Sequence, residues 1–389
     1  MTATPTTPAP AAEADPEAAL DLDYTELERE LRANVRALLA ARAPWTEVLE
    51  RSETDHPVDA ALWRALVEEL GVTALAVPEE SGGAGASWRE TAVVLEELGR
   101  AAAPVPFLGS AVLATAALLA AGQDAAAELA ALAGGERTGA LAVPFSTAPS
   151  AAFPSAVTAG VGGALTGRVT GVGDARIADL LLVPARDAEG APALYAVDAA
   201  ADGVELTPVV SLDSTRPLSD LELRAAPGRL LASGARAEEA LRAALVAGAA
   251  LLASEQLGTA EWALETTLAY VKERRQFGRT IGSFQAVKHR LADLWTSVAQ
   301  ARAVARAAAA ALAAGSADTE LNAALAQAFT GPVAVTAAEE AVQLHGGIGF
   351  TWEHPAHLYL KRAKSASLAL GTADRHRAAI AALVGLPPA

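Results

Sequence analysis

Several residue types are missing or scarce in this sequence, and each shortage excludes a class of chemistry. There is no cysteine among the 389 residues, which rules out disulfides, thiolate nucleophiles and zinc sites built on sulfur. Aromatic residues make up only 4%, so helices packed through small side chains are favoured over an aromatic-rich β architecture. The 30 Lys and Arg are outnumbered by 46 Asp and Glu. Because the formal net charge of −16 repels phosphates, nucleic acid and anionic membrane surfaces are not expected as partners.

Long hydrophobic runs are also missing. The longest strongly apolar run, residues 243–253, is too short to cross a bilayer. The chain does not begin with a basic segment followed by an apolar stretch. We therefore expect no membrane span, and a reducing cytoplasmic location fits the lack of cysteine. Hydrophobic residues still amount to 52%, enough for a sizeable core shared by two or three domains.

The texture of the sequence changes three times along the chain. Residues 1–22 are rich in Ala, Pro, Thr and acids, which predicts a flexible tail. Helical apolar spacing over residues 23–135 gives way to short apolar runs between turn signals over residues 136–232. Long helical patterns then return over residues 233–389. This order predicts an α+β fold in which two helical domains flank a middle, mostly antiparallel β domain.

Two local patterns resemble binding sites but lack the features that such sites require. The glycine-rich segment PEESGGAG, residues 78–85, lacks both a GK[ST] ending and a clean GxGxxG, so we interpret it as a loop. Ser87 and Glu90 behind it form a capping box, which predicts a helix start. The segment EHPAH, residues 353–357, lacks the HExxH order, and its proline interrupts the helix needed to align metal ligands. No metal site is expected.

The most informative segment is YVKERRQFGRTIGSFQAVKHRLADL, residues 270–294. It predicts a long helix with a basic last turn, a glycine turn and a new helix. All lysines of the chain lie in its last third, so an anion would bind there, although a solvated helix face is the ordinary alternative. These cations are Lys272, Lys288, Lys361 and Lys364, near Arg274, Arg275, Arg279, Arg290 and Arg362.

Residues 273–285 within this segment follow the pattern ERxQFGxxIxxFQ, and the chain thereby resembles the acyl-CoA dehydrogenases, whose C-terminal domain carries this signature. A second stretch, QLHGGIGFTWEHPAHLYLKR at residues 343–362, resembles the family's QxxGGxG segment. A third, GVTALAVPEESGGAG at residues 71–85, resembles its N-terminal PExxGGxG turn. The resemblance spans nearly the whole chain after the tail, and two long motifs at proper separation are far more specific than one glycine pattern.

The resemblance implies an acyl-CoA dehydrogenase-like fold with a C-terminal four-helix bundle. It also implies FAD bound across a subunit boundary, and α,β-desaturation of an acyl-CoA thioester in lipid metabolism such as fatty acid β-oxidation. Electron-transfer flavoprotein would be the electron acceptor. By the family's pattern, Arg274 faces the FAD pyrophosphate, Phe277 packs by the adenine, and Gln285 hydrogen-bonds the cofactor. The full set assigned to FAD is Arg274, Phe277, Gln285, Gln343, His345, Gly346, Gly347 and Thr372.

Ordinary structural roles exist for these residues too. An arginine can close a helix end, the phenylalanines can belong to a core, and paired glycines can cap a helix. For His345, contact with the flavin and capping of a helix both stay open. In the family, the C-terminal groups serve the FAD of the neighbouring subunit.

The resemblance fails at the catalytic base. The Glu of the family's EGT element is replaced by Leu370, ahead of the matching Gly371 and Thr372. The alternative base position, on the long helix before the signature, falls on Gly248. Neither residue accepts a proton, and general-base catalysis contributes roughly 10²–10⁴-fold to the rate. The TEP-like turn and the W-[IV]-[TS] strand that hold a subunit's own flavin are missing as well, with LAVPFSTAPS and TGVGDARIADL in the corresponding region.

This combination resembles the base-lacking subunit of heterotetrameric α₂β₂ bacterial acyl-CoA dehydrogenases that act on steroid side-chain CoA thioesters. Such a chain would complete the FAD site of a homologous partner carrying the glutamate, with two flavins per tetramer. Three alternatives stay open. The chain could be a homotetrameric dehydrogenase with a displaced base, Asp374 or Glu353, or a non-catalytic scaffolding and binding paralogue. It could also be a flavin oxidase or monooxygenase on the same fold.

Overall fold

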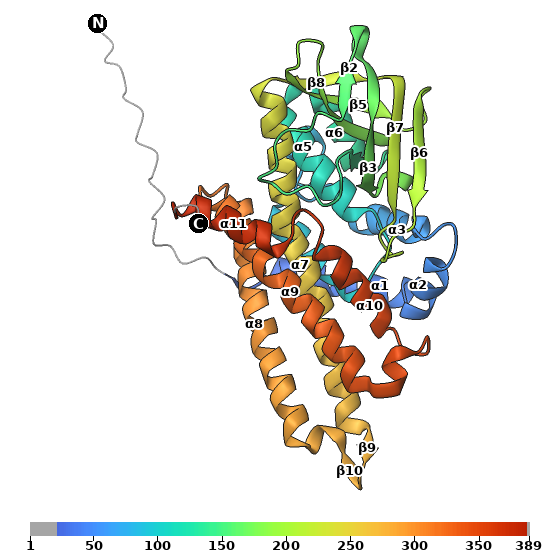
Figure 1. The fold of residues 1–389 in the computed structure, drawn as a ribbon, viewed down its shortest axis with the longest axis vertical. Helices are drawn as coiled ribbons and strands as arrows, with labels where there is room; N and C mark the ends of the chain where they lie inside the picture. Colours follow the sequence, from blue (N-terminus) through green and yellow to red (C-terminus); the bar gives the residue numbers. More distant parts are fainter. Residues whose placement is uncertain (1–21, 387–389) are drawn as a thin grey trace, which may run out of the picture.

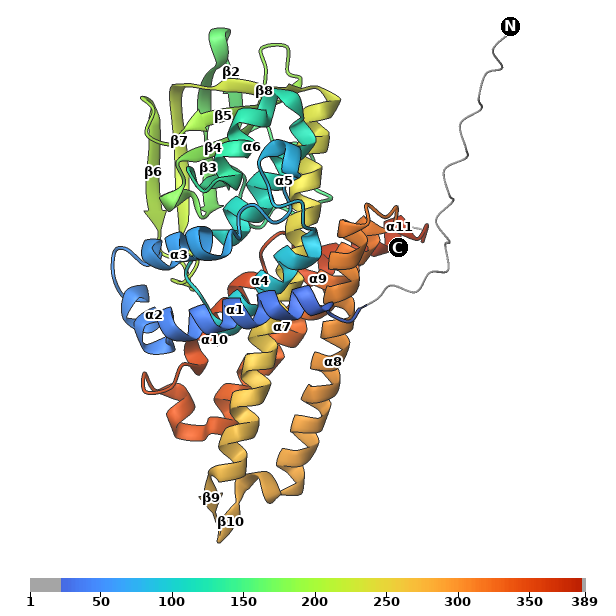
Figure 2. The same cartoon turned by 180° about the vertical axis from the view of Figure 1, so that it is seen from behind.

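The structure, a computed structural model, describes residues 22–386 (Figure 1). The flexible tail predicted for residues 1–22 lies outside the described residues except for Leu22. A β-sheet occupies one end of the molecule and long helices form the other, with the N-terminal helices packed beside both (Figures 1 and 2). The predicted order of helices, sheet and helices is confirmed.

Two of the N-terminal helices begin with capping boxes. The capping box predicted at Ser87 and Glu90 is present, with the Ser87 N–H donating to Glu90 Oε2 at 2.8 Å. A second capping box, at Thr25 and Glu28, begins the first helix. The elements are α1 (Glu26–Arg42), α2 (Trp45–Ser52), α3 (Ala60–Leu70), η1 (Glu79–Ser81), α4 (Trp88–Ala101), the π-helical η2 (Leu108–Ala114), α5 (Thr115–Ala121), η3 (Gln123–Ala125) and α6 (Ala126–Ala133).

The middle sheet is mostly antiparallel, as predicted, and it contains two parallel pairings. Strand β1 runs parallel to β4, and β2 meets β4 in parallel at Thr158 and Arg186. Between β1 and β4 the chain forms the β2–β3 hairpin instead of an α-helix. The sequence therefore contains no helical crossover that would have indicated the parallel pairing. The strands are β1 (Gly139–Leu141), β2 (Val157–Ala159), β3 (Ala164–Gly173), β4 (Leu180–Arg186), β5 (Pro192–Asp198), β6 (Val204–Val209), β7 (Leu218–Pro227) and β8 (Arg229–Ser233), in the order β6-β7-β3-β2-β4-β5-β8 with β1 beside β4.

The C-terminal part is built on α7 (Ala235–Glu273), which runs from the sheet to the opposite tip of the molecule (Figure 1). Among the described residues, α7 alone is long and apolar enough to cross a membrane, but 89% of that apolar stretch is buried inside the protein. It is therefore placed as a core helix. It packs against α4, α5, α8 and α9. The elements that follow are the β9–β10 hairpin (Arg275–Gln276 and Arg279–Thr280), η6 (Ile281–Ser283), α8 (Gln285–Ala313), α9 (Thr319–His345), η7 (Gly346–Phe350), α10 (Ala356–Ala366) and α11 (Ala373–Leu383).

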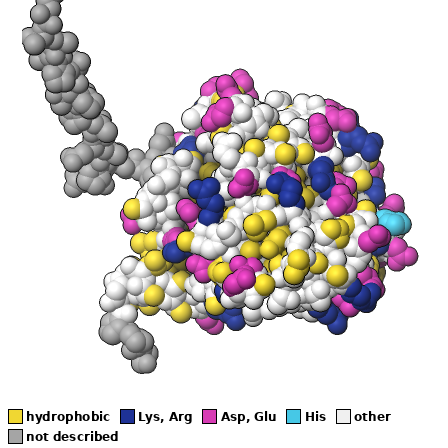
Figure 3. Space-filling model, turned by 90° about the horizontal axis from the view of Figure 1, so that it is seen from above, with side chains coloured by type: hydrophobic (Ala, Val, Ile, Leu, Met, Phe, Trp, Pro, Cys, Tyr) yellow, Lys and Arg dark blue, Asp and Glu magenta, His cyan; other side chains and the backbone are white. Residues whose placement is uncertain are grey.

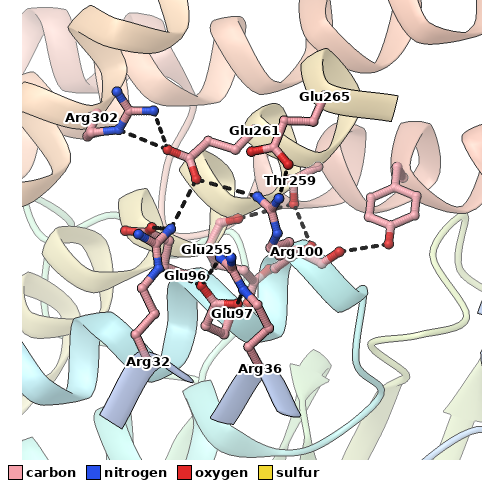
Figure 4. A network of polar contacts seen from close by, with 12 residues as sticks. Arg32, Arg36, Glu96, Glu97, Arg100, Glu255, Thr259, Glu261, Glu265 and Arg302 are labelled. Atoms are coloured by element: carbon pink, nitrogen blue, oxygen red, sulfur yellow. Dashed lines mark hydrogen bonds and ion pairs between the residues drawn. The ribbon is translucent and has the colours of Figure 1, made fainter. Parts of the chain in front are cut away.

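A network of charges fastens the N-terminal helices to α7 and α8 (Figure 4). Arg32 of α1 contacts Glu96 at 2.5 Å and Glu97 at 2.7 Å, and both carboxylates are buried. Glu261 of α7 pairs with Arg302 of α8 at 2.6 Å. Because a buried charge without its partner is costly, this network fixes the orientation of α1 on the long helices.

On the sheet end of the molecule, acidic and basic side chains are interspersed (Figure 3). This mixing agrees with the expectation, drawn from the net negative charge, that an anion would bind only where cations cluster locally.

Candidate functional site

An open pocket of about 670 Å³ lies where the C-terminal ends of α7 and α9 meet. Its lining includes Tyr270 and Arg274 from the end of α7 and Glu353 from the loop before α10. Five of the eight residues assigned to FAD line it: Arg274, Gln343, His345, Gly346 and Gly347. The structure thus brings together two motifs that are about seventy residues apart in the chain.

The glycine pair leaves bare backbone at the pocket. Gly346 ends α9 with φ +63°, a left-handed conformation that suits glycine. A Cβ atom on Gly346 or Gly347 would meet no atom within 4 Å, so both residues face open space. Gly349 differs, because a Cβ there would lie 2.5 Å from the Val342 carbonyl oxygen. The first two glycines therefore allow close approach of a ligand, and Gly349 allows the turn itself.

Arg274 ends α7 in an extended conformation. Its N–H donates to the Tyr270 carbonyl at 2.9 Å, and its own carbonyl accepts from the Ile281 N–H at 2.8 Å. The backbone of this arginine is thereby held while the side chain stays exposed at the pocket. A guanidinium so placed can pair with two phosphate oxygens at once.

The buried His345 ring lies between two other rings. Its centre is 4.4 Å from that of Tyr270 and 4.0 Å from that of His354, and its Nδ1 donates to the Ala341 carbonyl at 2.6 Å. Burial lowers the pKa of His345. Burial, followed by repulsion from His345 and His357, lowers the pKa of His354 to about 4. Both imidazoles are accordingly neutral near pH 7, and the His345 ring packs beside the pocket, stacked on Tyr270 and tilted by 35° against His354.

Three of the residues assigned to FAD lie away from this pocket. Phe277 stands at the tip of the β9–β10 hairpin, 91% exposed, with its ring 6.1 Å from that of Phe284. Gln285 is the exposed first residue of α8. Thr372 caps α11 by accepting a hydrogen bond from the Arg375 N–H at 3.4 Å. Within a single chain these residues do not meet the pocket, and their contact with FAD stays a prediction.

The two positions predicted from the resemblance to correspond to the family's base lie side by side. A Cβ atom on Gly248 would be 2.9 Å from Leu370 Cδ1 and 2.4 Å from Leu113 Cδ2. The Leu370 side chain is only 1% exposed, and its backbone has φ +54°. Both alternative base positions therefore face one volume, which leucine side chains fill.

The neighbouring turn packs directly onto this leucine. The Leu370 N–H donates to the Phe145 carbonyl at 2.8 Å. A Cβ on Gly371 would lie 2.8 Å from the Ala148 Cβ. The segment that stands in place of the family's flavin-holding turn is thus closed against the base position.

A cluster of buried charges beneath this turn was not predicted from the sequence. Glu255 of α7 pairs with Arg216 and, at 2.9 Å, with Arg362 of α10. Arg362 also donates to Thr215 at 3.0 Å, and the Arg216 guanidinium lies 5.4 Å from the Phe145 ring centre. Burial alone would raise the pKa of Glu255, but the two guanidiniums outweigh it and hold that pKa below its ordinary value. The only sequence signal was Glu255 itself, a glutamate just after the apolar run of residues 243–253.

Neither of the two substitute bases considered, Asp374 and Glu353, has its carboxylate placed to accept a proton beside Leu370. The Asp374 side chain is 90% exposed and pairs with Arg377 at 2.7 Å. Glu353 lines the pocket at the far end of α7. Glu255 is ionised but held between two arginines. No carboxylate of these three is placed to take a proton beside Leu370.

Fold and site together define a three-part protein with an open, arginine- and glycine-lined pocket at the ends of its long helices. The acyl-CoA dehydrogenase N-terminal domain family matches residues 25–136, and the acyl-CoA dehydrogenase C-terminal domain family matches residues 239–385. This chain belongs to the acyl-CoA dehydrogenase family.

Individual relatives agree with that assignment. The acyl-CoA dehydrogenase IpdE2 of Mycobacterium tuberculosis is 38% identical over 333 residues, which cover 86% of this chain and 89% of the relative. FadE34 of the same organism is 37% identical over 84% of this chain, but the match covers only 43% of FadE34. Among solved structures, a chain of the ChsE4–ChsE5 complex from Mycobacterium tuberculosis has a TM-score of 0.84 at 30% identity, covering 95% of this chain and 100% of that one. The Tcur3481–Tcur3483 steroid acyl-CoA dehydrogenase variant has a TM-score of 0.82 at 31% identity, covering 92% of this chain and 98% of that one.

Proposed function

We propose that this chain is one subunit of an FAD-dependent acyl-CoA dehydrogenase and completes the FAD site of a homologous partner subunit that carries the glutamate base, in an α₂β₂ assembly. The observation that carries the proposal is the contrast along α7. Gly248 and Arg274 stand 26 residues apart on this helix, which corresponds to roughly 39 Å. They are too far apart to serve one flavin ring, so the filled base position and the open pocket belong to different active sites.

The open pocket fits the pyrophosphate end of FAD. Arg274 supplies a charge, exposed Gln343 an amide, and Gly346 with Gly347 a bare backbone. The nearby Lys272, Arg275 and Arg279 add positive charge that favours a diphosphate in an otherwise acidic protein. The volume around Leu370 does not fit a flavin ring with a base beside it, because Leu113, Leu370 and Phe145 occupy it.

When bound, FAD accepts the substrate's β-hydrogen as hydride. This chain's own residues hold and orient the cofactor: Arg274 pairs with phosphate oxygens, and the glycine turn lets the backbone approach. The α-proton goes to the partner's carboxylate. The proposed substrate is an acyl-CoA thioester, with electron-transfer flavoprotein as the electron acceptor and the cytoplasm as the location.

The relatives support a two-chain enzyme. The ChsE4–ChsE5 and Tcur3481–Tcur3483 structures are each named for two proteins. The Tcur3481–Tcur3483 structure is described as a steroid acyl-CoA dehydrogenase. FadE34 contains more chain outside the match than inside it, which leaves room for a second such unit in one polypeptide. We therefore propose a steroid side-chain CoA ester as the substrate.

The test is co-expression with the cognate partner, with flavin absorbance per chain and subunit stoichiometry measured on the purified complex. We expect two flavins per tetramer. Arg274→Ala should weaken FAD binding roughly 10- to 100-fold, because a charge-assisted hydrogen bond to phosphate is worth about 1.5–3 kcal/mol. Arg224→Ala, an exposed arginine on the sheet, is the matched control and should have no effect.

Two outcomes contradict the proposal. Full flavin occupancy and dehydrogenase activity in this chain alone would point to a homotetrameric enzyme. Unchanged flavin content after Arg274→Ala would point to a scaffolding role for this subunit.

A further inference from the structure

Three rings in contact, called the ring stack below although its His345–His354 pair is tilted by 35°, connect the two sides of the pocket. The rings of Tyr270, His345 and His354 follow one another with centres 4.4 Å and 4.0 Å apart. Tyr270 stands one turn before Arg274, and His345 directly precedes Gly346. The stack thus links the helix end that carries the arginine to the helix end that carries the glycines, with His354 contributed by the loop before α10.

We propose that this ring stack positions Arg274 and the glycine turn relative to each other, and that it releases them when an imidazole takes up a proton. The inference rests on the proposed function, since the ligand in question is the partner's FAD. His345 and His354 are positioning residues in this scheme, because they act through the backbone and side chains that face the pocket.

The surroundings of the stack offer little compensation for a proton. Trp262 covers His354 at 6.4 Å and stacks on Tyr359 at 3.3 Å, so this side is aromatic. On α10, Lys361 adds positive charge, and burial followed by this lysine lowers the pKa of His357, while Glu53 at the end of α2 acts in the opposite direction on that pKa. Glu353 and Arg274 line the pocket beside the rings. The titratable or charged groups around the stack are therefore Glu53, Arg274, Glu353, His357, Tyr359 and Lys361.

The direction of the pH effect follows from the low pKa values of the two imidazoles. The pKa of His354 is about 4 and that of His345 is also lowered, against about 6.5 for a free imidazole. A group whose pKa is depressed by the fold favours the packed state when neutral. The stacking contribution is therefore complete above roughly pH 6.5 and is lost as the pH falls toward 4.

The experiment measures the dissociation constant of FAD from the complex with the cognate partner at pH 7.5 and at pH 5.5. If the stack opens when FAD leaves, the pKa values above limit the weakening due to His354 to about tenfold between these pH values. His354→Phe keeps a ring that cannot be protonated, so the ratio of the two constants should fall toward one. His354→Ala removes the ring, so binding should be weak at both pH values. Subunit stoichiometry is checked at each pH.

The outcomes separate this inference from the proposed function. A His354→Phe complex that keeps the wild-type ratio overturns the inference, provided that Arg274→Ala still weakens FAD binding. A wild-type complex whose FAD affinity does not change with pH also overturns it. If Arg274→Ala leaves FAD binding unchanged, the proposed function itself fails.

Discussion

Helix α7 carries two regions that differ in packing and in charge. Around Gly248, the helix is enclosed by leucine side chains and by the buried cluster of Glu255, Arg216 and Arg362. At its C-terminal end, around Arg274, the helix is exposed and faces an open pocket. Under the proposed function the two regions belong to different active sites, so a catalytic position can be lost from the first region without any effect on the second. If the proposal holds, the contrast teaches that a subunit can lack a base of its own and still be needed for the chemistry of its partner.

The largest expected effect comes from breaking the closed region at its charges. Glu255→Ala leaves the guanidiniums of Arg216 and Arg362 buried without their carboxylate, which should destabilise the chain by about 3–5 kcal/mol. Chemical unfolding of the purified complex measures this. Glu265→Ala is the matched control on the same helix, since its half-exposed carboxylate should contribute less than about 1 kcal/mol. Equal losses of unfolding free energy for both variants would show that the buried ion pairs of Glu255 stabilise the chain no more than the exposed pair of Glu265.

A smaller loss is expected from overfilling the base position. Gly248→Ala places a Cβ against Leu113 and Leu370, which should cost about 1–3 kcal/mol of unfolding free energy. Gly160→Ala, between β2 and β3, is the control, because its φ of −87° suits alanine and its Cβ would meet only the Ala164 carbonyl oxygen, at 3.6 Å, so no destabilisation is expected. Flavin content of the complex should stay the same for both variants. A loss of flavin on Gly248→Ala would mean that the two regions are coupled.

The smallest effect is expected at the exposed acid near Leu370. Asp374→Ala removes a side chain that is 90% exposed and paired only within its own helix turn, so the dehydrogenase rate of the complex should not change. Steady-state kinetics at saturating acyl-CoA test this. A drop in rate of the size expected for a lost general base, roughly 10²–10⁴-fold, would assign the proton transfer to this chain and erase the contrast.

Features set by neighbouring residues could be predicted from the sequence. The capping box at Ser87 and Glu90 and the order of helices and strands depend on local patterns, and the structure confirms them. Leu370 and Gly248, which separate motifs predict to be the two base positions, lie side by side in the structure, and their correspondence to the family's base stays a prediction.

Features that join distant segments could not be predicted. The parallel pairing of β1 with β4, the salt bridges of Glu255 and the stacking of His345 between Tyr270 and His354 each need coordinates from several elements. Phe277 and Gln285 illustrate a related limit, because the second surface that they are predicted to meet belongs to another chain.

The uninterrupted length of α7 has a consequence for how such a chain can change. Every residue inserted between Gly248 and Arg274 would advance the far end by about 1.5 Å and rotate it by roughly 100°. One insertion would therefore turn the arginine away from the glycine turn on α9. Single substitutions along this stretch leave the spacing intact. Helix α7 thus fixes both the distance and the rotation between its two regions, which a change of residue type can preserve and a change of length cannot.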